Sequence, residues 1–390
     1  MKFNTVKLGE YLYIKGRIGW KGLKKKEYLE KSGFRIVNGE SLTENGIDWN
    51  KAGYISKERY DESPEIMLQQ DDILISKDGT IGKIGYVDSL DTPTTVASGI
   101  FVIRNQMPEI INTRFIYHFF NSKYFKNFII MRTEGSVIPH LYQKDFVDLD
   151  FPMPELRVQD KIVGILDAIN NKIKLNKSIN NNLEQQAQAI YQQMFIDNAH
   201  SDWTKGTLSD ITDITMGQSP SSKSYNEDKN GTIFFQGRAE FGFRFPSVRL
   251  YTTEPKRMAQ SNDTLMSVRA PVGDINVAHT DCCIGRGLAA IHSKSNHQSF
   301  VLYTMFSLKK QLDVFNGEGT VFGSINRNSL NEMPILIPPD ENLDEFEKIV
   351  APMDLAIRNN YDEICRLQDI RDNLLPRLMS GELDISNIDI

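Results

Sequence analysis

The sequence predicts an α+β protein made of two tandem, related halves, each a mixed, β-rich globular segment with short helices followed by one long helix. Two observations lead to this prediction. Residues 162–195 and 346–378 share an apolar spacing that alternates between three and four residues, which is typical of a helix packed along a partner helix. The two stretches also align without gaps at an offset of 184 residues. We therefore interpret the chain as a tandem duplication with a pseudo-two-fold arrangement.

A polar residue interrupts the apolar spacing at the same place in both long helices, because Asn176 aligns with Asn360. A buried asparagine at such a position lowers stability but fixes the register of two paired helices, and we expect this role for both residues. Since each helix follows a separate globular segment, the helices are expected to form an antiparallel coiled coil. The expected segments are a first domain at 1–155, a first helix at 156–198, a second domain at 199–339, a second helix at 340–381 and a tail at 382–390.

The composition is that of a globular protein, with 40% hydrophobic and 25% charged residues in a chain of 390. The net charge of −6 argues, taken alone, against nucleic-acid binding. However, residues 339–390 contain 5 Lys and Arg against 13 Asp and Glu, so the rest of the chain is close to neutral and leaves room for a local basic face. No apolar run reaches the roughly 18 residues of a membrane-spanning helix. The three cysteines form no C-x-x-C pair, and a reducing cytoplasm is the expected location.

A basic stretch lies near the start of the first domain. Residues 15–26 combine several lysines and Arg17 with Trp20 and with glycines that let the backbone turn. One interpretation is that the cations contact phosphates while bases or sugars pack on the indole. The alternative is a solvated loop with a partly buried tryptophan.

A β-hairpin is predicted at residues 72–87, where β-branched runs flank a D-G turn, and the second half repeats it. Ser76 aligns with Ser267, and Gly82 aligns with Gly273. A glycine-rich turn of this kind can cradle a phosphate, but a structural hairpin is the preferred explanation.

A short helix with a broad apolar face is expected at 113–125, and its counterpart at 299–312. Both helices are expected to belong to the core. The following segment, 134–141, aligns with 318–325 at the same offset of 184 as the long helices. Divergence between the halves is concentrated upstream of this match, so a repeated frame carries a variable part.

The sequence contains no recognisable catalytic motif. It has no glycine-rich nucleotide motif, no zinc-protease or hydrolase motif and no tetrapeptide of the amino-methyltransferase type. The six histidines show no metal-ligand spacing with cysteine or carboxylate residues. We therefore expect a binding protein without catalytic residues or a metal site of its own.

Three local patterns are distinctive of one protein family. They are Asp72-Ile-Leu-Ile-Ser76 with Gly79-Thr-Ile-Gly-Lys83, Phe151-Pro-Met-Pro154 with Gln159, and Leu374-Leu-Pro-Arg-Leu-Met379 with Gly381. These patterns resemble the specificity (S) subunit of a type I DNA restriction–modification system, and the resemblance covers essentially the whole chain. The second half departs from the pattern, because Ala270-Pro-Val-Gly273 replaces Gly-Thr-Ile-Gly and no glutamine corresponds to Gln159.

The resemblance implies that each globular domain is a target recognition domain that reads one half of a bipartite, asymmetric site in double-stranded DNA. The paired helices would fix the distance between the half-sites and dock two methyltransferase subunits, and restriction subunits would join this core. S-adenosylmethionine, ATP and Mg²⁺ would bind to those partners, and this chain would bind no cofactor. The methyltransferase would act on an adenine that is flipped out of the duplex.

The candidate DNA-binding residues are mainly basic or amide side chains, because arginine and glutamine can contact bases while lysines mostly contact phosphates. In the first domain they are Arg17, Trp20, Lys21, Lys24, Lys25, Lys77, Thr80 and Lys83. In the second domain they are Gln218, Ser219, Lys223, Arg238, Arg244, Arg269 and Arg286. The alternative explanation for each of them is a solvated surface side chain.

Two alternative functions are kept open. One is a non-catalytic scaffold, whose domains bind other proteins and whose helices form a rod. The other is the S subunit of a system that methylates DNA but does not restrict it. Strong salt dependence of duplex binding would favour DNA recognition over the scaffold. The missing motifs disfavour a self-sufficient methyltransferase or nuclease.

Overall fold

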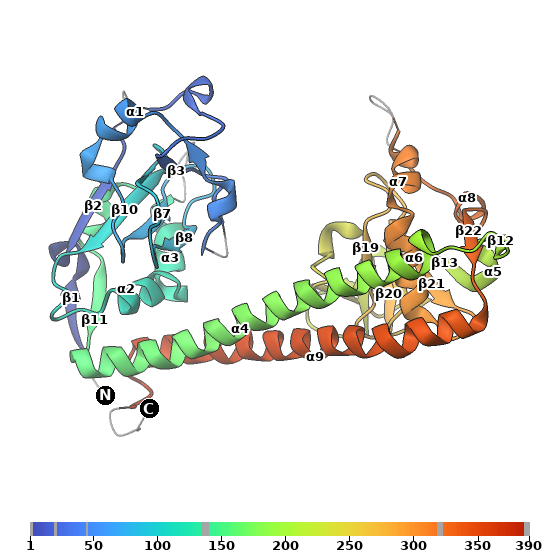
Figure 1. Cartoon of the computed structure of the whole chain (residues 1–390). Helices are drawn as coiled ribbons and strands as arrows, with labels where there is room; N and C mark the ends of the chain where they lie inside the picture. The colour runs from blue at the N-terminus through green and yellow to red at the C-terminus, as the bar shows by residue number, and fades with distance from the viewer. Residues whose placement is uncertain (1–2, 19–21, 44–45, 134–139, 318–322, 386–390) are drawn as a thin grey trace. The chain divides into compact units, whose positions relative to one another are not determined.

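The structure, a computed structural model, describes residues 3–18, 22–43, 46–133, 140–317 and 323–385. The chain divides into two compact units (Figure 1). Unit 1 comprises residues 1–174 and 365–390, and unit 2 comprises residues 175–364. The long helices α4 (Leu156–Tyr191) and α9 (Asp340–Met379) each contribute one part to each unit, so unit 1 is not a continuous stretch of sequence.

Unit 1 is a β-rich domain with short helices. Its strands are β1 (Asn4–Lys7), β2 (Leu12–Gly16), β3 (Arg35–Val37), β4 (Leu42–Thr43), β5 (Gly46–Ile47), β6 (Gly53–Tyr54), β7 (Ile73–Ser76), β8 (Ile84–Tyr86), β9 (Thr94–Val96), β10 (Ile100–Asn105) and β11 (Asp150–Met153). Its short helices are α1 (Lys57–Asp61), α2 (Thr113–Phe120) and α3 (Lys123–Thr133). The main sheet is antiparallel with the order β2-β10-β7-β8, and a second sheet has the order β6-β3-β9.

Unit 2 repeats this plan. Its strands are β12 (Thr204–Thr207), β13 (Thr212–Met216), β14 (Tyr225–Asn226), β15 (Thr232–Phe235), β16 (Leu250–Thr252), β17 (Met258–Ala259), β18 (Thr264–Ser267), β19 (Ile275–Val277), β20 (Cys282–Ile284), β21 (Leu288–Ser293) and β22 (Pro334–Ile337). Its short helices are α5 (Leu208–Ile211), α6 (Gln298–Ser307), α7 (Lys309–Leu312) and α8 (Arg327–Asn331). The main sheet has the order β13-β21-β18-β19, and the second sheet has the order β14-β16-β15-β20-β17.

The two main sheets share their strand order and their register. Ser76 at the end of β7 pairs with Ile100, and Ser267 at the end of β18 pairs with Leu288. The second sheets differ, because among the described residues unit 1 has three strands where unit 2 has five. The duplicated frame predicted from the sequence is therefore the main sheet with its helices, and the divergence lies in the second sheet.

The single short helix expected at 113–125 is wrong in detail, because the structure has the two helices α2 and α3 there. The backbone N–H of Asn121 still bonds back to Tyr117 O at 3.2 Å and ends α2. Ser122 Oγ then accepts a hydrogen bond from Phe125 N at 3.3 Å and caps the start of α3. In unit 2, α6 and α7 are separated at the equivalent place by Leu308.

The core of each unit is continuous with the apolar face of the long helices. In unit 1, Phe115 and Phe120 of α2 lie in one buried cluster with Ile162 of α4 and Leu378 of α9. In unit 2 the corresponding cluster includes Phe300, Ala187, Tyr191, Phe346 and Val350. Burial of a large apolar side chain contributes about 1.5–3 kcal/mol. Each domain is therefore held on its own part of the helix pair by the hydrophobic effect.

Within unit 2, three hydrogen bonds show that α4 and α9 run antiparallel. Asn360 Nδ2 donates to Asn180 Oδ1 at 2.8 Å, Asn180 Nδ2 donates to Ile357 O at 3.2 Å, and Asn176 Nδ2 donates to Glu363 Oε2 at 2.7 Å. Asn176 and Asn180 are almost fully buried. The two asparagines singled out from the sequence thus make different contacts, and Asn180 is the partner of Asn360 that sequence reasoning did not single out.

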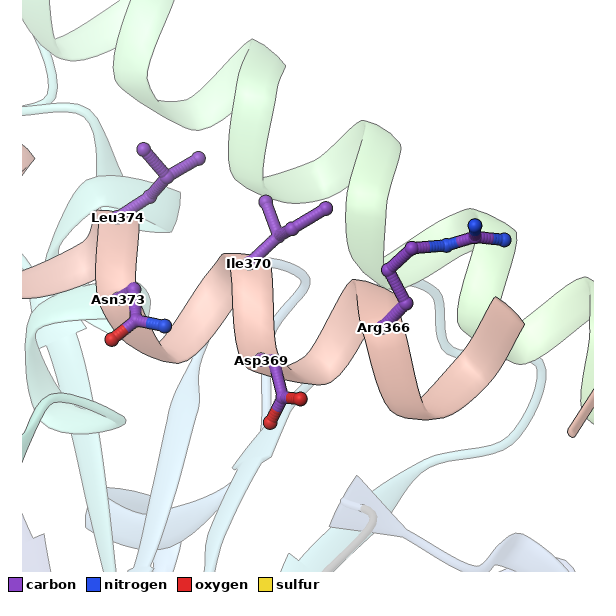
Figure 2. A pocket seen from close by; sticks show the side chains of 5 residues that line it. All are labelled: Arg366, Asp369, Ile370, Asn373 and Leu374. Atoms are coloured by element: carbon purple, nitrogen blue, oxygen red, sulfur yellow. The ribbon is translucent and has the colours of Figure 1, made fainter. Parts of the chain in front are cut away.

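An open hollow of about 440 Å³ lies along one face of α9 in unit 1. Its lining residues, Arg366, Asp369, Ile370, Asn373 and Leu374, recur at steps of three and four and so form one stripe of the helix. Figure 2 shows that Ile370 and Leu374 point to one side of the helix, whereas Asp369 and Asn373 point to the other.

In the part of the chain that the structure describes, no helix is long and apolar enough to cross a membrane.

The pair of Asn180 and Asn360 predicts a non-additive effect on stability. Replacing Asn360 by leucine removes the donor from the buried Asn180 Oδ1, and we expect a loss of about 1–3 kcal/mol in the free energy of unfolding. Replacing both asparagines by leucine removes the unpaired group as well and should recover most of this loss. Denaturant unfolding of both single variants and the double variant measures the coupling. Additive losses would show that the two amides act independently.

Candidate nucleic-acid interface

The turn between β7 and β8 in unit 1 is closed by one serine side chain. Ser76 Oγ donates to Thr80 O at 2.6 Å and accepts from Lys83 N at 2.9 Å, while Gly82 N donates to Ser76 O at 2.9 Å. Gly82 has a φ of +87°, a region that favours glycine. The hairpin predicted from the sequence is present, but its loop spans residues 77–83 rather than a two-residue turn.

The turn between β18 and β19 in unit 2 has the same set of bonds. Ser267 Oγ donates to Pro271 O at 2.7 Å and accepts from Asp274 N at 2.9 Å, and Gly273 N donates to Ser267 O at 2.9 Å. Gly273 has a φ of +83°. The alignment of Ser76 with Ser267 and of the two glycines is therefore confirmed by their identical hydrogen-bonding roles.

A helix packs against each turn at the aligned glycine, Gly82 or Gly273. A Cβ atom on Gly82 would lie 2.9 Å from Ile129 Cδ1 of α3, and one on Gly273 would lie 2.8 Å from Leu312 Cβ of α7. The next segment of chain then holds each turn from another side, because Leu141 N bonds Lys77 O in unit 1 at 3.1 Å. In unit 2 the matching bond joins Ile325 N to Val268 O. Both turns are thus held by packing and by backbone hydrogen bonds on more than one side.

In unit 2, five loops are joined by backbone contacts into one surface, which we call the unit 2 loop cluster. It consists of residues 217–220, 236–238, 268–274, 285–287 and 323–325. Val268 N bonds Gly287 O at 2.9 Å, Gln218 N bonds Ile284 O at 3.0 Å and Ala270 N bonds Gly323 O at 3.0 Å. Arg286 N donates to Ser219 Oγ at 3.2 Å.

The unit 2 loop cluster brings together five of the predicted DNA-binding residues, namely Gln218, Ser219, Arg238, Arg269 and Arg286. Arg238 forms an ion pair with Asp274, which also lies 3.2 Å from Lys309 Nζ. Arg269 and Arg286 are exposed, and in the part of the chain that the structure describes neither side chain has a hydrogen-bond or ion-pair partner. These two guanidinium groups are therefore available to an anion or a base edge. The remaining lysine candidate, Lys223, is exposed on a 3-10 turn at Ser222–Ser224.

In unit 1, three of the candidates share the turn that follows β7. Lys77 Nζ lies 3.2 Å from Asp78 and 5.5 Å from the centre of the Phe101 ring, while Lys83 Nζ donates to Gly39 O at 3.3 Å. Thr80 is exposed at the tip of the turn. Lys24 and Lys25 are exposed beside the 3-10 turn at Lys25–Glu27, apart from the hairpin in sequence. Trp20 and Lys21 fall outside the described residues.

Similarity to known proteins identifies the family of this chain. The family model for the type I restriction modification DNA specificity domain matches residues 2–185 and 200–362. The chain belongs to the type I restriction–modification DNA specificity family. It is 29% identical to a putative type I restriction enzyme MjaX specificity subunit from Methanocaldococcus jannaschii, over 93% of this chain and 90% of that protein. It is 25% identical to the MjaIX specificity subunit of the same organism, over 78% and 76%.

A solved structure supports the same fold for this family member. The crystal structure of a type I restriction-modification system S subunit from M. genitalium matches with a TM-score of 0.63 and 16% sequence identity. The match covers 98% of this chain and 97% of that chain.

In the described ranges, no group of three or more His, Cys, Asp or Glu side chains is placed to hold a metal ion.

The structure corrects the assignment of Arg17, which sequence reasoning placed at the DNA surface. Its side chain is 3% exposed. Its Nε donates to Val96 O at 3.1 Å, and its terminal nitrogens donate to Ser63 Oγ and Thr95 Oγ1. Removal from water is the main cause that lowers its pKa. All three nitrogens bond to the protein interior, so Arg17 joins β2 to β9 and is not exposed at the surface where it was predicted.

Arg244 is a second correction, because its side chain is also 3% exposed. Its terminal nitrogens lie 3.1 Å from Glu184 of α4 and 3.0 Å from Asp354 of α9, and one donates to the hydroxyl of Tyr303 at 3.1 Å. Tyr303 in turn donates to Asp354 at 2.9 Å. Arg244 therefore attaches a loop of the second domain to both long helices and to α6, all within unit 2.

Sequence reasoning missed the acidic members of the candidate interface. Asp78 in the first turn pairs with Lys77 and His140, and Asp274 in the second turn pairs with Arg238 and Lys309. The candidates predicted from the sequence are basic, amide, hydroxyl and aromatic side chains and include no carboxylate. An acidic residue inside a glycine-rich turn flanked by basic residues was the available signal, because such a carboxylate needs a nearby cation or donor.

The backbone packing of the loop cluster predicts different costs for two glycine substitutions. A Cβ on Gly217 would lie 2.1 Å from Gly285 O, whereas one on Gly237 would meet nothing within 4 Å. We expect Gly217→Ala to lower the free energy of unfolding by about 1–3 kcal/mol because the two loops must move apart. Gly237→Ala, the matched control in the same cluster, should change it by less than about 0.5 kcal/mol. Equal effects in denaturant unfolding would show that the loops do not pack this closely.

The buried network around Arg244 predicts a large loss of stability that depends on pH. Arg244→Met leaves two carboxylates without their cation and should cost about 3–5 kcal/mol, whereas Arg257→Met, at an exposed position, should cost less than about 0.5 kcal/mol. Burial already raises the pKa of Glu184. The folded state therefore holds this proton more tightly than the unfolded state, and its stabilising contribution is lost as pH rises through the folded pKa.

Without Arg244 the pKa of Glu184 rises further, because the neighbouring positive charge is gone. The deficit of Arg244→Met relative to the wild type should thus be smaller at about pH 5 than at about pH 8. Thermal or denaturant unfolding at both pH values measures it. A deficit that grows on acidification would contradict the assignment of Glu184 to this network.

Proposed function

We propose that this chain is the DNA sequence-recognition subunit of a type I restriction–modification complex and carries no catalytic residues of its own. Each globular domain reads one half of a bipartite, asymmetric site in double-stranded DNA. The main support is that both units present the same serine-closed turn with different outward side chains. A repeated scaffold with different side chains suits the recognition of two unequal half-sites, because the scaffold fixes position and the side chains choose the base.

We further propose that α4 and α9 together set the distance between the half-sites. A slip of one heptad between the two helices would shift one domain by about 10 Å, or roughly three base pairs. The buried asparagine contacts support this role, since a slipped pair would leave Asn176 and Asn180 without their partners Glu363 and Asn360. Burying an amide side chain between the two helices without a hydrogen-bond partner costs free energy, and this cost disfavours the slipped register.

The helices are also proposed to dock two methyltransferase subunits, which restriction subunits then join. Apolar side chains on the helices support this part, because Leu175 and Leu355 are 54% and 57% exposed and Ile370 lines the hollow of Figure 2. A docked subunit would remove these exposed apolar side chains from water, which favours association. S-adenosylmethionine, ATP and Mg²⁺ would bind to the partners, and the complex would work in the cytoplasm.

The test is a methylome of a host that lacks adenine methylation and expresses this chain with its methyltransferase subunit. We expect one bipartite motif with two defined halves and a fixed gap, because two rigid readers are joined by one helix pair. Duplex binding by the purified complex should weaken steeply as salt rises. A soluble, assembled complex that leaves the genome unmodified would favour the protein-interaction scaffold instead. Modification without restriction of incoming DNA would identify a methylation-only system.

The same assay tests the spacer role with the double variant Asn180→Leu and Asn360→Leu. We expect this variant to stay folded but to methylate sites with more than one gap length, because the loss of the Asn180–Asn360 hydrogen bond leaves Asn176 with Glu363 as the remaining buried asparagine contact named above that disfavours a heptad slip. The wild-type gap, retained without exception, would show that other contacts fix the register.

A further inference from the structure

The two serine-closed turns carry opposite charges at equivalent positions. Ser76 and Ser267 make the same hydrogen bonds, and so do Gly82 and Gly273. In the alignment that follows from these bonds, Asp78 corresponds to Arg269. The spacing is the same in both turns, with this residue two positions after the serine and four before the glycine. One scaffold therefore presents a carboxylate in unit 1 and a guanidinium in unit 2.

A second pair of opposite charges in these turns is occupied within the protein. Lys83 corresponds to Asp274, and both residues donate their backbone N–H to the turn serine. The side chain of Lys83 bonds to Gly39 O, and that of Asp274 is paired with Arg238 and Lys309. Asp78 is also paired, with Lys77 and His140, but its side chain is 43% exposed against 30% for Asp274. Arg269 is exposed, so the position of Asp78 and Arg269 is the more open of the two to an external group.

The surroundings of Asp78 and Arg269 fit two different kinds of base edge. The Asp78 side chain is 43% exposed and pairs with Lys77 and His140, and a carboxylate has about four acceptor sites, so it can still accept another N–H. A phosphate would repel this carboxylate, whereas the amino group of cytosine or adenine is a donor that matches it. Arg269 is exposed, and in the described ranges its guanidinium has no partner. Two of its N–H groups can therefore donate side by side to O6 and N7 of a guanine.

We propose that Asp78 and Arg269 are a matched pair of base-reading residues that set one position in each half-site. Asp78 accepts a hydrogen bond from the exocyclic amino group of a cytosine or adenine, and Arg269 donates two hydrogen bonds to a guanine. This inference rests on the proposed reading of DNA by the two domains and names the side chains that make the halves unequal. The duplicated scaffold explains why a single substitution can change one half without moving the other.

The experiment is the methylome of four variants in the methylation-free host. Asp78→Arg and Asp78→Asn should change the preferred base at one position of one half-site, and Arg269→Asp and Arg269→Gln should do so in the other half. The preference at that position should shift on the order of 10-fold to 100-fold, the range for one bidentate base contact. The second half and the gap should stay as in the wild type. The conservative variants Asp78→Asn and Arg269→Gln keep the test valid if a charge reversal prevents folding.

Matched charge changes away from the turns serve as controls. Glu109→Arg lies beyond the end of β10 that is opposite the turn, since Ile100 at the other end pairs with Ser76. Lys205→Asp lies on β12, which pairs with β22 rather than with the main sheet. Both residues are exposed, and both variants should leave the motif unchanged.

Two outcomes would overturn the inference in different ways. A motif of unchanged sequence with uniformly slower methylation at all sites would show that the side chains contact phosphates, or contact no DNA, although the domains still read it. A wild-type complex that yields no bipartite motif would overturn the proposed function itself, before any variant is compared. A base change confined to the predicted half-site supports the inference.

Discussion

The rest of each unit depends on the burial of the long helices against the domain. The apolar faces of α4 and α9 are part of the domain cores, because Ile162 and Leu378 belong to the cluster of unit 1 and Tyr191 and Phe346 to that of unit 2. A domain detached from its helices would expose this apolar surface to water. Folding of the sheet and packing of the helices are therefore coupled within each unit. Because the sheet packs on the helices and carries the turns, the orientation of the helices determines the position of the turns in that unit.

Polar contacts between the domains and the long helices fix the position in which the apolar surfaces pack. In unit 2, Arg244 reaches from a domain loop to carboxylates on both helices, and Arg358 of α9 donates to Asn262 and to Ser261 of another loop. In unit 1, His118 of α2 bonds Asp167 of α4 at 2.8 Å. Apolar packing tolerates sliding, whereas such bonds are made in one position only. This combination suits a molecule whose function depends on where its loops are held.

The sequence was sufficient where the signal is local or periodic. The seam spacing predicted the long helices, and the serine and glycine alignment predicted equivalent hairpins. It failed where partners are distant in sequence, since Glu184 and Asp354, which surround Arg244, lie 60 residues before it and 110 after it. The missing glutamine of the second half is another case. Gln159 accepts a hydrogen bond from Asn112 N in unit 1, and Glu347 accepts one from Phe300 N in unit 2, one helical turn away from the expected position.

The corrected arginines show what distinguishes a structural cation from one that is free to bind a ligand. Arg17 and Arg269 are both arginines in loops that follow strands, and composition cannot separate them. Arg17 is surrounded by a carbonyl and two hydroxyls, whereas Arg269 projects from a turn whose backbone bonds are already satisfied by Ser267 and by residues 323–325. Because Ser267 and the neighbouring segment satisfy the backbone of this turn, the turn does not need the side chain of Arg269 to hold its shape. In a duplicated scaffold, such a side chain can change while the fold is kept, and the proposed reading of two unequal half-sites depends on this freedom.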